Sequence, residues 1–306
     1  MLIKRIAIEQ LDWDSLRVFL EVARTGNLTQ AARRLQLDHS TISRRICQLE
    51  VTLNANIFVR QNRGMSLTDA GRKILEHVER MDSSMVMLRE SLATNSSAVG
   101  GTVRLATMEG IASLYLSMFI PELKAKHPEL HLELVTSPYH VNLNRREADI
   151  FLSFFKPPGR SMHIEKLGEF YLDIYGSETY FAHAGKPASK CELEKHHFVT
   201  YIDDLVQLEA VRWLDDVLLQ RETTFTSSSM IAQMVAASRG AGLVLLPRFS
   251  VSHFPGLVRI DLPDLVVTRS LWISAHDDLQ PTPRVKAVTE FIRGLIRRDT
   301  SSFAVM

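Results

Sequence analysis

Residues 29–53 read TQAARRLQLDHSTISRRICQLEVTL, and this stretch decides the fold of the N-terminal part of the chain. It begins with a short helix that Thr29 is placed to cap, in which Ala31 and Ala32 present almost no side-chain bulk. Residues this small allow a second helix to cross at short distance. After a short connection, Asp38 is placed to cap that second helix. The pattern predicts a helix-turn-helix.

The second helix of this pair has one apolar face and one polar face. Its apolar residues recur at spacings of three and four, and they are Ile42, Ile46, Leu49 and Leu53. The opposite face carries short polar groups and an arginine near the N-terminal end, which is the end that a recognition helix presents to base edges. The predicted base-contacting residues on this face are His39, Ser40, Ser43, Arg44 and Gln48.

An amphipathic helix is predicted ahead of this pair, with Asp12 or Asp14 as its cap and Gly26 as its end. Its inner face consists of Leu16, Phe19, Leu20 and Ala23.

Two short β-prone stretches, 57–60 and 65–67, follow the pair and are joined by residues 61–64. Gly64 can take the positive φ of a tight turn, so the stretches predict a β-hairpin wing. Arginine side chains at or beside its tip are placed to meet phosphate or to enter a minor groove. The predicted DNA contacts outside the recognition helix are Arg60 and Arg63 in this wing and Thr29, Arg33 and Arg34 in the short helix.

Charge is distributed unevenly along the 306 residues, although the formal net charge of the whole chain is only +1. Residues 1–72 hold 11 Lys and Arg against 7 Asp and Glu, a net charge of +4. Residues 73–98 carry −1 and residues 99–306 carry −2. A local basic excess is what nucleic-acid binding requires, and it coincides with the helix-turn-helix.

Three amphipathic helices and a hairpin also fit a helical packing module without DNA contacts. Order and detail favour the DNA reader, because the segment resembles the LysR-type transcriptional regulators. The matching residues are Phe19, Ala31-Ala32, Leu35, Ser40-Thr41-Ile42-Ser43-Arg44, Ile46, Leu49-Glu50, Leu53, Phe58, Arg60, Leu67-Thr68 and Ala70-Gly71. Asn54 stands where the family usually has glycine, and His39 where it often has glutamine. Asn54 tolerates a left-handed conformation, whereas His39 alters the base that is read.

A long helix capped by Thr68 is predicted next, about 25 residues and roughly 40 Å in length. One apolar stripe runs along it, formed by Leu75, Val78, Met81, Met85, Leu88 and Leu92. The stripe needs a partner, either the chain's own C-terminal domain or a second copy of the chain. In LysR-type regulators this segment is the dimerisation helix, so the resemblance implies a dimer. The polar stretch 94–97 ends the helix as a flexible link.

Beyond Gly100-Gly101 the pattern alternates strands and helices, which favours a parallel sheet. Strands are predicted at 103–106, 130–135, 150–153, 172–175, 198–202, 223–226, 243–246 and 270–274, and helices at 111–126, 141–146, 208–219, 230–239 and 284–296. The last of these elements, the strand at 270–274 and the helix at 284–296, are predicted to complete the first lobe. The region resembles the LysR effector-binding domain, itself similar to periplasmic solute-binding proteins, through Gly101-Thr102-Val103-Arg104-Leu105, Pro121-Glu122-Leu123, Pro128-Glu129-Leu130, Ala148-Asp149-Ile150 and residues 240–247.

The fold class predicted is therefore a winged helix-turn-helix, dominated by α-helix, joined to a two-lobed α/β domain. The predicted limits are 1–68 for the DNA-binding domain, 69–98 for the linker helix and flexible link, and 99–306 for the effector-binding domain. Lobe I spans about 102–168 plus 270–306, and lobe II about 169–269.

Ligands of open α/β lobes bind beyond the C-terminal ends of strands, where helix N-termini offer free N–H groups. The predicted effector-binding residues are Thr107, Met108, Glu109, Thr136, Ser137, Ser153, Phe154, Tyr201, Ser227, Ser228 and Ser229. Hydroxyls at strand ends also serve as helix caps. The Glu109 carboxylate would repel a ligand carboxylate and, near Phe154 and Tyr201, suits an amine or other cation.

Several kinds of chemistry have no motif in the sequence. We find no GxSxG nucleophile elbow and no phosphate-binding GxxxxGK[ST], which argues against an enzyme. Cys47 and Cys191 form no CxxC, and His196-His197 lack further ligands at metal spacing, so we expect neither disulfide, metal nor cofactor. No signal peptide or bilayer-spanning run is visible, and we expect a cytoplasmic protein.

The predicted function is sequence-specific binding of double-stranded DNA, modulated by a small-molecule effector held between two lobes. The predicted partners are DNA with interrupted dyad symmetry, further copies of the chain in a dimer or a tetramer, and the effector. The alternatives are a catalytic α/β domain carrying a DNA-binding tether and a solute-binding protein with a helical appendage. Turnover of a bound ligand would reveal the former, and the latter lacks the export signal it needs.

Overall fold

The computed structural model describes residues 11–61, 64–92, 99–136, 148–158, 162–206, 212–218, 220–252, 254–263 and 265–304. They form two compact units, one made of the described residues up to 92 and the other of those from 99 onward. Within the described part of the chain, no helix combines the length and the apolar character that crossing a bilayer requires.

The N-terminal unit is a helix-turn-helix followed by a hairpin and a long helix, as predicted. Its elements are α1 (Trp13–Thr25), α2 (Leu28–Leu35), α3 (His39–Leu53), β1 (Phe58–Gln61), β2 (Gly64–Leu67) and α4 (Asp69–Leu92). The side chains of Phe19, Ile42 and Ile57 are fully buried where these elements meet. Burial of these apolar side chains, from two helices and the loop before β1, supplies the hydrophobic free energy that holds this small unit together.

Most of the predicted helix ends are confirmed. Asp12 caps α1, Gly26 ends it in the left-handed conformation at φ 62°, and Asn54 ends α3 in the same conformation at φ 50°. The Thr68 hydroxyl accepts a hydrogen bond from Gly71 N at 3.0 Å at the start of α4. Local capping chemistry thus sets these boundaries, as the sequence pattern indicates.

The predicted cap of α2 is wrong. Asn27 caps this helix, because its Oδ1 accepts hydrogen bonds from Thr29 N at 2.8 Å and Gln30 N at 3.2 Å. Thr29 is instead an exposed residue in the first turn of α2. Asn and Asp are at least as good as Thr at this position, and Asn27 has the extended backbone that a cap needs.

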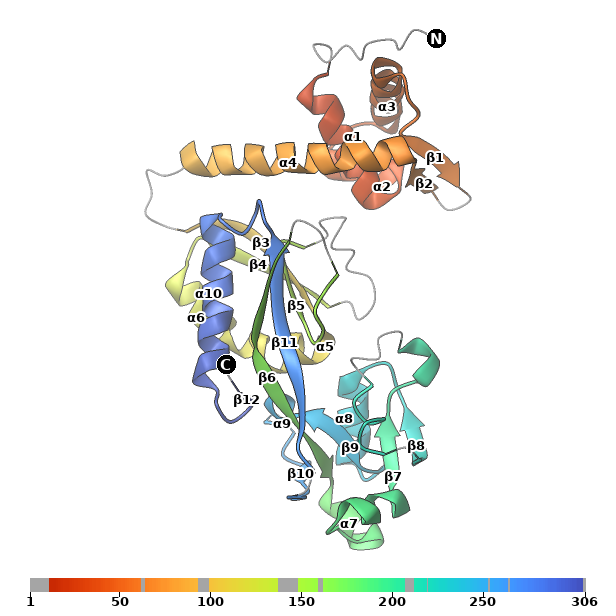
Figure 1. Ribbon diagram of the computed structural model, residues 1–306, viewed down its shortest axis with the longest axis vertical. Coiled ribbons are helices and arrows are strands. Elements are labelled where there is room, and N and C mark those ends of the chain that lie inside the picture. Colours follow the sequence, from red (N-terminus) through yellow and green to blue (C-terminus); the bar gives the residue numbers. More distant parts are fainter. Residues whose placement is uncertain are drawn as a thin grey trace. The chain divides into compact units, whose positions relative to one another are not determined.

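The C-terminal unit is built around a mixed sheet (Figure 1). Three parallel strands, β5 (Ile150–Ser153), β3 (Gly101–Thr107) and β4 (Leu130–Thr136), lie side by side in that order. Two long antiparallel strands, β6 (Met162–Gly176) and β11 (Val267–His276), continue from this sheet into the second lobe. The prediction of a parallel sheet therefore holds only for part of each lobe.

The second lobe contains β9 (Val244–Pro247) and β10 (Val258–Arg259), both antiparallel to β6, and the parallel pair β7 (His197–Thr200) and β8 (Glu222–Thr226). The register of β6 against β11 shifts between Leu271 and Trp272. This shift lies close to the predicted lobe limits at 168 and 270, and we keep the names lobe I and lobe II for those ranges. The limits themselves stay a prediction.

The remaining elements are α5 (Glu109–Leu114), η2 (Leu116–Phe119), α6 (Ile120–Lys126), α7 (Glu178–Ala184), η4 (Lys190–Lys195), η5 (Asp203–Leu205), α8 (Met230–Ser238), α9 (Arg248–Val251), α10 (Pro283–Arg298) and β12 (Phe303–Ala304). The single helix predicted for 111–126 is three shorter ones, and Pro121 stands in the first turn of α6, where proline is tolerated. Residues 212–218 form turns instead of the predicted helix. The helix predicted for 141–146 and the link at 94–97 lie outside the described residues.

Candidate functional site

The polar face of α3 is open to solvent within the N-terminal unit. His39, Ser40, Arg44 and Gln48 are exposed and Ser43 is half-buried, whereas Ile42, Ile46 and Leu49 on the opposite face are buried. The fold therefore presents the five predicted side chains on one helical surface. An arginine beside short hydroxyl and imidazole groups matches the donors and acceptors on base edges.

The arginines of α2 differ in their surroundings. Arg33 and Arg34 are both exposed, and Arg34 Nη1 donates to Glu21 Oε1 of α1 at 2.9 Å. An exposed pair of this kind is weak and leaves the guanidinium able to turn towards phosphate.

The wing is an antiparallel hairpin in which Phe58 pairs with Leu67 and Gln61 with Gly64. It is held against the end of α1, because Met65 N donates to Gly26 O at 2.8 Å. A Cβ on Gly64 would lie 2.3 Å from that same carbonyl oxygen, so only glycine fits this close approach. Arg60 is exposed on β1, and the predicted contact Arg63 lies outside the described residues.

The apolar stripe of α4 divides into two parts. Val78 is 2% exposed in the core of the N-terminal unit, and Leu75 is half-buried against that core. Met81, Met85 and Leu88 are 44%, 46% and 53% exposed. Val78 thus packs in the core of its own unit and is not available to a second chain. The part of the stripe that a partner could cover starts at Met81. The side chain of Leu92 lies outside the described residues.

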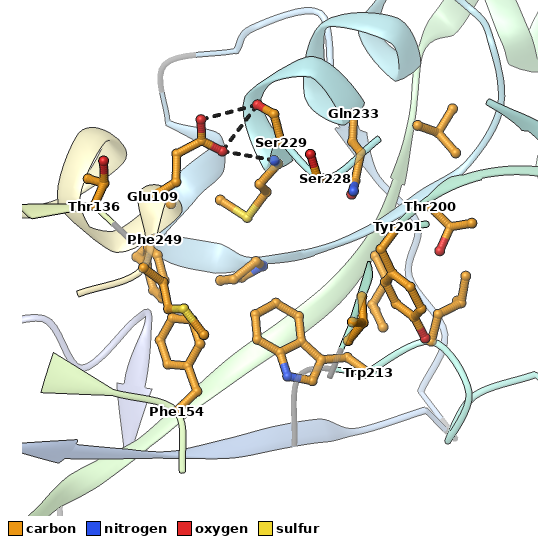
Figure 2. A pocket seen from close by; sticks show the side chains of 18 residues that line it. Glu109, Thr136, Phe154, Thr200, Tyr201, Trp213, Ser228, Ser229, Gln233 and Phe249 are labelled. Carbon is orange, nitrogen blue, oxygen red and sulfur yellow. Dashed lines mark hydrogen bonds between the residues drawn. The ribbon is translucent and has the colours of Figure 1, made fainter. Parts of the chain in front are cut away.

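A pocket of about 340 Å³ lies between the two lobes of the C-terminal unit (Figure 2). Lobe I contributes the C-terminal ends of its strands and the start of α5, and lobe II contributes β7, β9 and the start of α8. The predicted effector-binding residues that line the pocket are Met108, Glu109, Thr136, Phe154, Tyr201, Ser228 and Ser229.

Three predicted hydroxyl residues do not line the pocket, because nearby backbone groups satisfy them. Thr107 Oγ1 donates to Leu152 O at 2.8 Å, and Ser153 Oγ donates to Phe155 O at 2.7 Å. Ser227 Oγ accepts from Ser229 N at 3.1 Å. The sequence prediction assigns Thr107, Ser153 and Ser227 to the effector, and the structure corrects it, because none of the three lines this pocket. Ser137 lies outside the described residues.

Sequence reasoning missed much of the lining. The missed residues are Gly110, Val199, Thr200, Val206, Trp213, Leu214, Met230, Gln233, Leu245, Pro247 and Phe249. Trp213 packs its ring edge-on against Phe154, with centroids 5.4 Å apart, to form an aromatic wall. Strand ends in lobe I gave a usable signal, but the contribution of β9 and of the 212–218 segment has no local signature.

The Tyr201 hydroxyl is directed into a polar cluster of its own lobe. It donates to Asp215 Oδ1 at 2.7 Å, and the same carboxylate oxygen accepts from Arg221 Nη1 at 2.8 Å. Burial, followed by the hydrogen bond to Asp215, raises the pKa of Tyr201 well above its ordinary value. The phenol is therefore neutral at physiological pH.

Glu109 begins α5 in lobe I and reaches across the pocket to α8 in lobe II (Figure 2). Ser229 Oγ lies 3.1 Å from both carboxylate oxygens, and Met230 N donates to Oε2 at 3.0 Å. This carboxylate already has two partners in its own chain, the free N–H at the start of α8 and the cap hydroxyl, which the sequence did not indicate.

Models of known families match both units. The bacterial regulatory helix-turn-helix protein model of the lysR family matches residues 13–72, and the LysR substrate binding domain model matches residues 96–297. The chain belongs to the LysR family. It is accordingly a DNA-binding transcriptional regulator with an effector-binding domain.

Relatives of this LysR-type chain extend over most of its length. The Mau operon transcriptional activator of Paracoccus denitrificans is 24% identical over 295 residues, which cover 96% of this chain and all of that protein. The transcriptional activator AaeR of Escherichia coli is 25% identical over 236 residues, 76% of each chain. The solved structure of ArgP from Mycobacterium tuberculosis covers 97% of this chain with a TM-score of 0.69 at 18% identity, which shows a common fold.

Among the described residues, no three His, Cys, Asp or Glu side chains are grouped as a metal ion would need. Cys47 and Cys191 are both exposed. Two of the proteins quoted above, from Paracoccus denitrificans and Escherichia coli, are named transcriptional activators.

Proposed function

We propose that α3 reads base edges in a major groove through His39, Ser40, Ser43, Arg44 and Gln48. The observation that supports this is the exposed polar face of α3, whose opposite face is buried in the core of the unit. Arg60 of the wing and Arg33 and Arg34 of α2 contact phosphate, together with Thr29 and, beyond the described residues, Arg63. Contacts of this second kind raise affinity without selecting sequence.

The DNA-reading units act in pairs in this proposal. The exposed stripe residues of α4, Met81, Met85 and Leu88, cover one another when two copies of the helix pack together, which removes apolar surface from water. A dimer of this kind presents two recognition helices to half-sites about 34–36 Å apart, so its target has interrupted dyad symmetry. Assembly of dimers into a tetramer stays a prediction. Because a regulator of this family acts on DNA, we infer a cytoplasmic protein.

The effector binds in the pocket between the lobes. Side chains from both lobes line this pocket, so a ligand bound there interacts differently with different lobe arrangements. A ligand shifts an equilibrium only by its differential affinity for the two states, and a decisive shift needs about 10⁴-fold, or about 5.5 kcal/mol. Population shift between lobe arrangements is therefore the proposed mechanism of regulation.

The test is a footprint of the full chain on bound genomic fragments, with three single variants. Arg44→Ala is expected to relax sequence preference at one position of each half-site by about 1–3 kcal/mol. Arg60→Ala should weaken binding to all sequences alike and reduce the salt dependence of affinity. Arg17→Ala, an exposed arginine of α1 in the same unit, is the control and should change neither. An Arg44→Ala protein as selective as the parent would contradict the assignment of α3.

A further inference from the structure

The Glu109 carboxylate lies where a helix N-terminus binds anions. Ser229 is the N-cap of α8, and its Oγ also accepts from Ala232 N at 3.3 Å, so the carboxylate is added to an ordinary cap. Met230 N belongs to the first turn of α8, a helix of nine residues. The N–H groups of a first turn have no acceptor within the helix. The partial positive charge of this helix end favours an anion. The chain supplies that anion itself.

The other described residues of the lining offer no group of opposite charge to an ionised carboxylate. Among the described residues around the pocket, Glu109 is the only one that carries a full charge, and none is Arg, Lys or His. A ligand carboxylate would therefore lose its hydration without finding a cation, which is costly. A ligand cation would compete with the two donors that already bind Glu109.

Neutral hydrogen-bonding groups do line the pocket. The Thr200 hydroxyl is buried at 5% exposure and has no hydrogen-bond partner among the described residues. Ser228 and Gln233 lie in the same lining, opposite the aromatic wall of Phe154 and Trp213 (Figure 2). The volume of about 340 Å³ is near the lower end of the ~300–1,000 Å³ typical of ligand pockets. Such a lining suits a small, ring-sized molecule with uncharged polar groups.

We propose that Glu109 is a built-in anion that sets the specificity of this pocket: it fills the anion position at α8, so the pocket takes an uncharged aromatic molecule and rejects carboxylates. The proposal rests on the effector pocket of the proposed function and names its ligand class.

Three aromatic probes of similar size separate the possibilities by charge: benzamide, benzoate and benzylammonium at pH 7. Their binding to the full chain is measured by calorimetry and by ligand-observed NMR. The parent protein is expected to bind benzamide about tenfold or more tightly than either ion.

Two variants of Glu109 distinguish two effects on benzoate: the filling of the anion position at the start of α8, and repulsion by the negative charge of Glu109. Glu109→Ser removes the carboxylate and vacates the start of α8, so benzoate affinity should rise about tenfold or more. Glu109→Gln removes the charge but still fills the position, and its gain for benzoate should be severalfold smaller. The matched control is Glu178→Ser, which removes an exposed glutamate from the first turn of α7, outside the pocket, and should leave all three affinities unchanged.

Several results would overturn the proposal. These are preferential binding of benzoate or benzylammonium by the parent, equal benzoate gains in the Ser and Gln variants, or no binding of any probe by the parent and the Ser variant. Circular dichroism and the DNA footprint are measured on each variant. An intact footprint with a failed probe series rejects the ligand class alone, whereas an absent footprint in the parent rejects the proposed DNA-reading function.

Discussion

Glu50 of α3 binds the backbone of Ile57 at the start of the wing. Its Oε1 accepts a hydrogen bond from Ile57 N at 2.9 Å and another from Phe58 N at 3.3 Å. Ile57 is fully buried, so its N–H has no access to water if this acceptor is lost. The recognition helix and the hairpin are thereby joined by one carboxylate. This carboxylate therefore helps to fix the position of α3 relative to the hairpin, and so of the side chains proposed to read bases and to contact phosphate.

Glu50→Ala is expected to open the start of the wing. Leaving the buried Ile57 N–H without a partner costs about 1–3 kcal/mol, so amide hydrogen exchange at 57–58 should accelerate by about tenfold or more. Glu50→Gln keeps an acceptor oxygen and should show a much smaller change. Hydrogen exchange of the full chain, resolved by peptide, measures both. Equal protection in the Ala variant and the parent would mean that this bond does not hold the wing.

The exposed part of the α4 stripe predicts the association state. Met85→Glu places a charge where two stripes would meet and should shift the protein from dimer to monomer in sedimentation velocity. Met87→Glu is the matched control, since Met87 is 43% exposed on the same helix but lies off the stripe. A dimer that survives Met85→Glu, or that is lost equally in both variants, would contradict the assignment.

The N-terminal unit could be predicted almost completely because its signals are local. Helical periodicity and caps act within a few residues, and the hairpin is closed by a short turn. The error at Thr29 arose because Asn27, two residues earlier, starts the helix there by accepting from Thr29 N and Gln30 N. Local patterns suffice where each element's partners are its sequence neighbours.

The pocket was harder to predict because distant segments build it. Glu109 was identified from its place after the first strand, but its partners Ser229 and Met230 are about 120 residues away. The antiparallel ribbon of β6 and β11 brings β9 and Trp213 to the same cavity, and no periodicity in the sequence encodes that arrangement. Strand-end hydroxyls such as Thr107 were assigned to the ligand since backbone acceptors cannot be seen in a sequence.

The pair of Glu165 on β6 and Arg293 on α10 predicts a pH dependence of stability. Arg293 binds both carboxylate oxygens, at 3.1 and 2.7 Å, and this hydrogen bonding lowers the pKa of Glu165 in the folded protein. A lowered folded pKa contributes stability above the unfolded value of about 4.3, and the contribution is lost as pH falls through the folded pKa.

Glu165→Gln should therefore lower the thermal midpoint at pH 7, by the equivalent of about 1 kcal/mol for a partly exposed pair, and have a smaller effect near pH 3.5. Scanning calorimetry at the two pH values measures the difference. Glu178→Gln, which replaces an exposed glutamate of α7, serves as the control. A destabilisation that is equal at both pH values would show that packing, and not the ion pair, accounts for the effect.

Thr200 allows a prediction in which stability and binding change in opposite directions. Its buried hydroxyl has no partner among the described residues, and a buried unsatisfied polar group costs about 1–3 kcal/mol. Thr200→Val removes the hydroxyl at nearly constant volume, so the ligand-free protein should unfold at the same or a higher temperature. If the hydroxyl is there to bind a polar group of the ligand, benzamide affinity should fall about tenfold, whereas Thr200→Ser should retain it. Thermal unfolding and calorimetry on the same samples separate the two effects, because a structural role would lower stability in the Val variant and leave benzamide binding unchanged.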